Sequence, residues 1–121
     1  MKPRMTQALL EPLVRLRGVR AAVVASEDDA LVIDAHTHVD VDADALAAFG
    51  VSLVRRARLA GRDIGAGAPE VIALEAEGGR LIAAVREELL VLILTGEDAH
   101  EGLVRVTAQQ VADALAEQVA G

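Results

Sequence analysis

The sequence contains no cysteine, no tryptophan and no tyrosine, and Phe49 is its single phenylalanine. Without cysteine, the chain can form neither disulfide bridges nor thiolate metal sites. Without large aromatic groups, its core must be built from small aliphatic side chains, which allow helices and strands to approach closely. This composition favours packed layers of secondary structure over a deep aromatic pocket.

Long hydrophobic runs and an excess of basic charge are also missing. No apolar stretch approaches the length of a membrane span, and Glu11, Pro12 and Arg15 interrupt the segment after the basic start too soon for a signal peptide. The net charge of −7 disfavours binding to nucleic acid or to anionic membranes. We therefore expect a cytoplasmic protein in which residues 1–121 form a single domain.

Hydrophobic periodicity predicts the element order α-β-β-α-β-β-β-α. Helices are expected over 6–16, 43–61 and 101–119, and strands over 19–26, 30–35, 70–76, 80–85 and 89–95. Pro12 should sit near the start of the first helix or kink it. The glycine pair Gly78-Gly79 is typical of a tight hairpin that requires positive φ. The segment 89–95 is apolar on both alternating faces, as in a central strand. The pattern predicts an α+β fold with a five-stranded, mostly antiparallel sheet and helices on both faces.

The middle helix carries two apolar stripes where a monomer needs one. The larger groups are Leu46, Phe49, Leu53 and Ala60, and the smaller ones are Ala43, Ala47, Gly50, Val54 and Ala57. A glycine inside a helix costs about 1 kcal/mol relative to alanine unless something gains from the missing side chain. Close approach of a second helix would be such a gain, so the smaller stripe is predicted to form a dimer interface. A wider contact with the chain's own core is the alternative.

The strand before the glycine pair is expected at an edge of the sheet. Natural edges are usually guarded by charge or proline, but here Pro69, Glu70, Glu75 and Glu77 guard only the ends. The unguarded middle consists of Val71, Ile72, Ala73 and Leu74. These residues are predicted to pair with their symmetry mates, which would continue one sheet across a twofold axis.

The arrangement resembles the Roadblock/dynein-light-chain family. The resemblance rests on four segments and on the element order: Leu16-Arg17-Gly18-Val19-Arg20-Ala21-Ala22-Val23-Val24, Gly65-Ala66-Gly67, Glu75-Ala76-Glu77-Gly78-Gly79-Arg80-Leu81-Ile82 and Gly102-Leu103-Val104-Arg105. It implies a profilin-like architecture and a homodimer joined through the third strand, with the two middle helices on one face. It also implies a non-catalytic protein that binds a Ras-like small GTPase and modulates its nucleotide cycle. A dimeric scaffold or adaptor without effect on nucleotide state is the alternative.

Partners of this family tend to dock on the middle-helix face. The residues there that are candidates for contact with a partner are Arg55, Arg56, Arg58 and Arg62, and the alternative is that they are solvated surface charges. The chain departs from the family in the first hairpin, where Asp28-Asp29-Ala30 replaces a short turn with glycine. That departure puts the partner's identity in doubt.

Three local motifs are weaker than they look. His36-Thr37-His38 resembles the metal pair of amidohydrolases, but 121 residues cannot supply their barrel. A calcium loop starting at Asp40 would need glycine at Ala45 and glutamate at Val51. The phosphate-binding pattern over 62–67 follows a helix, although it should open one. We therefore predict no catalytic residue, no cofactor and no metal, and partners limited to a second copy and another protein.

Overall fold

The most apolar strand, β5 (Leu89–Thr95), lies at the centre of the sheet in the computed structural model, which describes residues 3–120. The sheet has the order β2-β1-β5-β4-β3, and every neighbouring pair is antiparallel. The other elements are α1 (Pro3–Val14), β1 (Val19–Ser26), β2 (Val32–Thr37), α2 (Ala43–Asp63), β3 (Val71–Ala76), β4 (Gly79–Arg86) and α3 (Glu101–Ala120). The predicted fold class and element order are confirmed, and β2 and β3 form the two edges.

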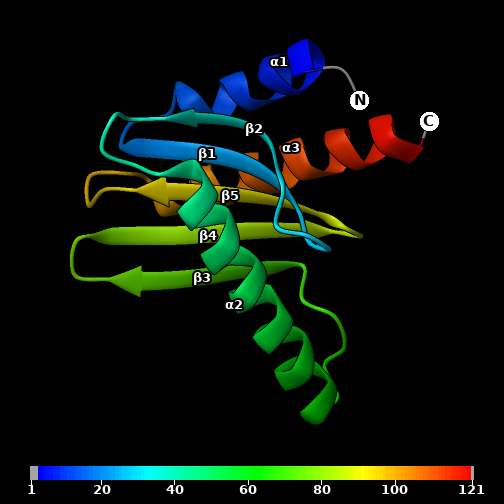
Figure 1. The fold of residues 1–121 in the computed structure, drawn as a ribbon. Coiled ribbons are helices and arrows are strands. Elements are labelled where there is room, and N and C mark those ends of the chain that lie inside the picture. The colour runs from blue at the N-terminus through cyan, green and yellow to red at the C-terminus, as the bar shows by residue number, and fades with distance from the viewer. Residues whose placement is uncertain (1–2, 121) are drawn as a thin grey trace.

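Helices cover both faces of the sheet. Helices α1 and α3 lie on one face and α2 crosses the other (Figure 1). Side chains of β5 alternate between two buried clusters: Val91 and Ile93 pack toward α1 and α3, and Leu90 and Leu92 pack toward α2. Burial on both faces explains why this strand takes the central position.

The first helix and the second strand differ from expectation. Helix α1 begins at Pro3 and ends at Val14, so Pro12 lies near its end rather than its start. Strand β2 begins two residues later than predicted, because Ala30 has a φ of 56° and the N–H of Leu31 donates to Asp29 Oδ1 at 3.1 Å. These turn contacts lengthen the connection from β1.

The hairpin between β3 and β4 is confirmed, and the predicted positive φ occurs at one of its two glycines, since Gly79 has a φ of 159°. Ala76 and Gly79 are the last paired residues, and Gly78 has no positive φ. A Cβ atom at Gly79 would collide with the carbonyl oxygen of Thr95 on β5. Glycine is therefore favoured at this position both by its positive φ and by the close approach of the neighbouring strand β5.

Helix α2 packs through its small stripe onto its own sheet. Asp42 caps the helix by accepting from the N–H groups of Asp44 and Ala45. The buried residues of α2 are Ala47, Gly50, Val51 and Val54. A Cβ atom at Gly50 would lie 2.6 Å from Leu92 Cδ1, so the missing side chain lets the helix approach β5.

The predicted dimer role of the small stripe is therefore wrong for Ala47, Gly50 and Val54, which are buried within one copy of the chain. Ala43 and Ala57 are only half-buried. The close approach that Gly50 permits occurs between this helix and its own sheet.

Replacing Gly50 by leucine should lower the free energy of unfolding by about 1–3 kcal/mol, because the added side chain meets Leu92 in a filled core. Urea denaturation followed by circular dichroism measures the change. Ser52→Leu, at an exposed position of the same helix, is the matched control and should change stability far less. Equal stability of the Gly50 variant and the wild type would contradict this packing.

Candidate partner-binding surface

The larger stripe of α2 faces outward. Phe49, the single phenylalanine of the chain, keeps 49% of its surface exposed, and Leu46 and Leu53 beside it are half-buried. An exposed aromatic group flanked by leucines is a feature of protein interfaces. The apolar surface that α2 leaves exposed is thus on its larger stripe, whereas the smaller stripe was predicted to be exposed for a dimer contact.

The second half of α2 has no sheet of its own beneath it. All the buried residues of the helix lie between Ala47 and Val54, and none is buried over 55–63. Figure 1 shows this half continuing beyond β3, the last strand on that side. Leu59 and the cap residue Ile64 are 56% and 78% exposed. The helix therefore projects apolar groups past the edge of the sheet.

An apolar groove lies between α2 and the hairpin of β3 and β4. It encloses about 310 Å³, and its side chains include Leu46 and Phe49 from the helix and Leu74, Leu81 and Leu94 from the sheet. Leu74 is 41% exposed although it sits on a strand. The groove opens beside the first half of α2, at the end of the sheet where β3 turns into β4.

Strand β3 presents free backbone groups at this edge. The N–H of Val85 donates to the carbonyl of Glu70, which fixes the hydrogen-bonded pairs of the β3–β4 ladder. Because such pairs alternate, the N–H and C=O groups of Val71, Ala73 and Glu75 point away from β4. The expectation that Val71, Ile72, Ala73 and Leu74 lie on an edge strand is confirmed.

Two of the four candidate arginines, Arg55 and Arg58, contact the turn between β1 and β2. Arg58 holds Glu27 through two hydrogen bonds, Nε to Oε2 at 2.8 Å and Nη2 to Oε1 at 2.6 Å. Arg55 donates to the carbonyls of Glu27 and Asp28 at 3.2 Å. Arg56 and Arg62 are exposed. The structure separates the four residues into a pair that anchors α2 and a pair that faces solvent.

The contact between Arg58 and Glu27 is partly shielded from solvent, with side chains 32% and 14% exposed. The hydrogen bonds that Arg58 donates to Glu27 raise the pKa of its guanidinium above the ordinary value, although burial lowers it. Arg58 therefore carries its positive charge at neutral pH, and its contact with Glu27 stabilises the position of α2 over the first hairpin.

The two histidines whose spacing resembles a metal pair lie at the opposite edge of the sheet. His36 is on β2 and His38 follows it, and both are exposed. Within residues 3–120, no group of three or more His, Cys, Asp or Glu side chains could hold a metal ion. In the same range, no helix has both the length and the apolar character needed to cross a bilayer.

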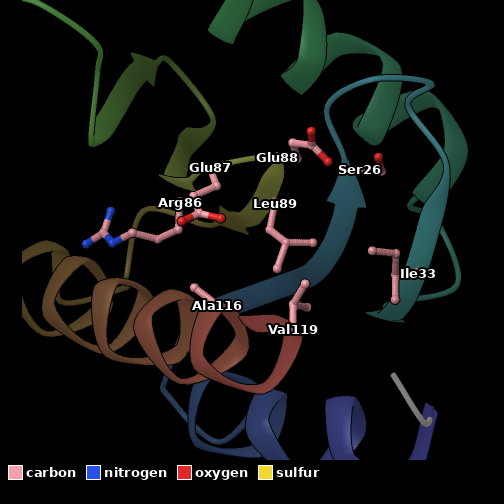
Figure 2. A pocket seen from close by; sticks show the side chains of 8 residues that line it. All are labelled: Ser26, Ile33, Arg86, Glu87, Glu88, Leu89, Ala116 and Val119. Carbon is pink, nitrogen blue, oxygen red and sulfur yellow. The ribbon is translucent and has the colours of Figure 1, made fainter. Parts of the chain in front are cut away.

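A second hollow of about 370 Å³ opens near the end of α3 (Figure 2). It is lined by Ser26, Ile33, Arg86, Glu87, Glu88, Leu89, Ala116 and Val119. Arg86 points away from Ser26 in this view, and its Nε donates to Asp113 Oδ1 at 2.6 Å. The carboxylates of Glu87 and Glu88 also line the hollow, but among the described residues no hydrogen bond joins either of them to the Ser26 hydroxyl, so the nucleophile–base contact of a nucleophilic site is not formed.

Comparison with known proteins gives consistent matches over most of the chain. The family model described as the Roadblock/LC7 domain matches residues 5–95. An uncharacterized protein of Methanocaldococcus jannaschii, MJ0310, is 27% identical over 111 residues, which cover 92% of this chain and 96% of that protein. The Roadblock/LC7 domain from Streptomyces avermitilis has a TM-score of 0.83 at 20% identity, covering 99% of this chain and 98% of that one. Myxococcus xanthus MglB has a TM-score of 0.88 at 14% identity, covering 98% of each chain.

Replacing Arg58 by alanine should lower the free energy of unfolding by about 1–3 kcal/mol, because Glu27 loses two charge-assisted hydrogen bonds. Arg58→Lys should recover only part of the loss, since an ammonium group cannot form the bidentate contact. The exposed Arg56→Ala is the control, with a change of at most about 0.5 kcal/mol. Guanidinium denaturation measures all three, and equal losses for Arg58→Ala and Arg56→Ala would refute the anchoring role.

Proposed function

Because the chain belongs to the Roadblock/LC7 domain family, we propose that it is a homodimeric binding protein whose partner is a Ras-like small GTPase. The observation that carries the proposal is the half of α2 that extends past β3 with its apolar groups exposed. The edge strand β3 runs past this half, and the groove lies between the first half of the same helix and the β3–β4 hairpin. A second copy would cover all three features together.

In the proposed dimer, two β3 strands pair across a twofold axis and continue one sheet through both copies. The free N–H and C=O groups of Val71, Ala73 and Glu75 then find partners. The projecting half of each α2 lies over the partner's sheet, and Phe49, Leu53 and Ala60 from the larger stripe replace the small stripe as the helical contact. Ala43 and Ala57, which are half-buried, stay at its margin.

The GTPase is proposed to dock on the face that carries both α2 helices. Arg56 and Arg62 are the arginines available for it, because Arg55 and Arg58 are engaged by the first hairpin. Guanidinium groups at an interface recognise carboxylates with defined geometry. The protein would act in the cytoplasm by changing the nucleotide cycle of the GTPase, without contributing a catalytic residue.

Ala73→Pro should convert the dimer to a monomer. Proline removes an N–H that points away from β4, so the fold should persist, as proline is tolerated on sheet edges. Size-exclusion chromatography with light scattering gives the molar mass, and circular dichroism reports the fold. The matched control is Ala73→Ser, which keeps the backbone donor and should remain dimeric. A folded Ala73→Pro dimer would rule out pairing through β3.

The double variant Arg56→Glu/Arg62→Glu should bind the cognate GTPase about tenfold more weakly, or more so, because two cations are reversed on the docking face. Arg105→Glu, on α3 at the other face of the sheet, should bind like the wild type. Isothermal titration calorimetry gives the affinities, and single-turnover GTP hydrolysis and nucleotide exchange give the effect on the cycle. Binding with unchanged rates would support the adaptor alternative, and no binding by the wild type would refute the GTPase proposal.

A further inference from the structure

The sheet has a second edge, β2, on which edge pairing could equally occur. Strand β2 pairs only with β1, and the N–H of His38 donates to the carbonyl of Arg20 at 2.9 Å. By the alternation of an antiparallel ladder, the backbone groups of Ala35 and Thr37 point away from β1. A chain with two open edges could add copies at both, and would then form filaments rather than closed dimers.

The β1–β2 ladder is irregular, whereas the β3–β4 ladder is regular. Its register shifts between Val24 and Ala25, so that Ile33 has no partner of its own on β1. Such a bulge bends and twists the strand and interrupts an edge that would otherwise be a flat template. The pairing of β3 with β4 runs from Val71 to Ala76 without a shift.

A side chain also occupies one of the two outward N–H groups of β2, that of Ala35. The N–H of Ala35 donates to Asp34 Oδ1 at 2.8 Å, so it is not available to an incoming strand. Among the described residues, no side chain accepts from the outward N–H groups of Val71 or Ala73 on β3. The two edges therefore differ in the availability of an outward N–H group: that of Ala35 on β2 is occupied, whereas those of Val71 and Ala73 on β3 are available to an incoming strand.

The hydrogen bond from Ala35 to Asp34 is accompanied by a destabilising feature of the same carboxylate. Its Oδ2 atom is buried and has no hydrogen-bond partner. An unpaired buried acceptor destabilises a fold by about 1–3 kcal/mol. The net contribution of the Asp34 side chain to the stability of the fold is therefore small, and a variant that lacks it should remain folded.

We propose that Asp34 is the specificity-determining residue of assembly: it closes the β2 edge and restricts strand pairing to β3. The inference rests on the proposed β3 dimer for its second half. The occupant that Asp34 excludes is the β2 strand of a second copy of this chain.

Asp34→Ala tests the proposal directly. With the N–H of Ala35 released, the molar mass from light scattering should rise with concentration beyond that of the wild type, and dilution should reverse the rise. Asp34→Asn is the matched control, because its amide oxygen can accept the same hydrogen bond, and it should behave as the wild type does. An Asp34→Ala variant with wild-type mass at every concentration would overturn the proposal.

The Ala73→Pro background separates this inference from the proposed function. Ala73→Pro alone should be monomeric, and Asp34→Ala/Ala73→Pro should form a dimer through β2. If Ala73→Pro is monomeric and the double variant is too, the role of Asp34 is refuted and the β3 dimer stands. If Ala73→Pro stays dimeric, the β3 interface fails, and Asp34 is then judged by the mass of Asp34→Ala alone.

Hydrogen exchange in the unmodified protein gives a test that needs no variant. The Ala35 amide should exchange at least about tenfold more slowly than the Thr37 amide, after correction for intrinsic rates, because only Ala35 has an acceptor. Equal corrected rates would mean that Asp34 does not close the edge.

Discussion

The contact of Gly50 with Leu92 determines where α2 lies, and the exposed surface of the molecule follows from it. A glycine at this point allows the first half of a 21-residue helix to approach the sheet closely enough to bury Ala47 and Val54. The ion pair of Arg58 with Glu27 then fixes the helix over the first hairpin. Since the helix is longer than the sheet beneath it, its second half must continue past β3 with Leu59 and Ile64 exposed.

The two edges of the sheet complement this asymmetry. The edge beside the projecting helix is regular and offers free backbone groups, whereas the far edge carries a bulge and the carboxylate of Asp34. Only one edge of the sheet therefore combines exposed apolar side chains with free backbone groups. A single edge of this kind favours a closed dimer over a filament of many copies. All the features from which the proposed dimer interface is built therefore lie within the domain itself.

The element order was predictable because it depends on local patterns. Leu89–Thr95 is apolar on both alternating faces, and only a strand covered on both sides satisfies that pattern. The orientation of α2 was not predictable in the same way. Periodicity finds both stripes of a helix but does not say which one faces the sheet, and Gly50 gains from close approach to β5 as well as it would from another helix.

Contacts between distant residues left no local signal in the sequence. Glu27 and Arg58 are 31 positions apart, so only the folded chain shows that Arg58 anchors α2. The positive φ expected at the Gly78-Gly79 turn was a local argument and occurs at Gly79, whereas the collision that a Cβ atom there would have with Thr95 on β5 left no local signal. The most direct test of the central claim is the concentration dependence of hydrogen exchange at the outward amide of Ala73, with the inward amide of Ile72 as reference. The β3 dimer predicts protection of Ala73 that is lost on dilution while Ile72 stays protected, and fast exchange of Ala73 at every concentration would contradict it.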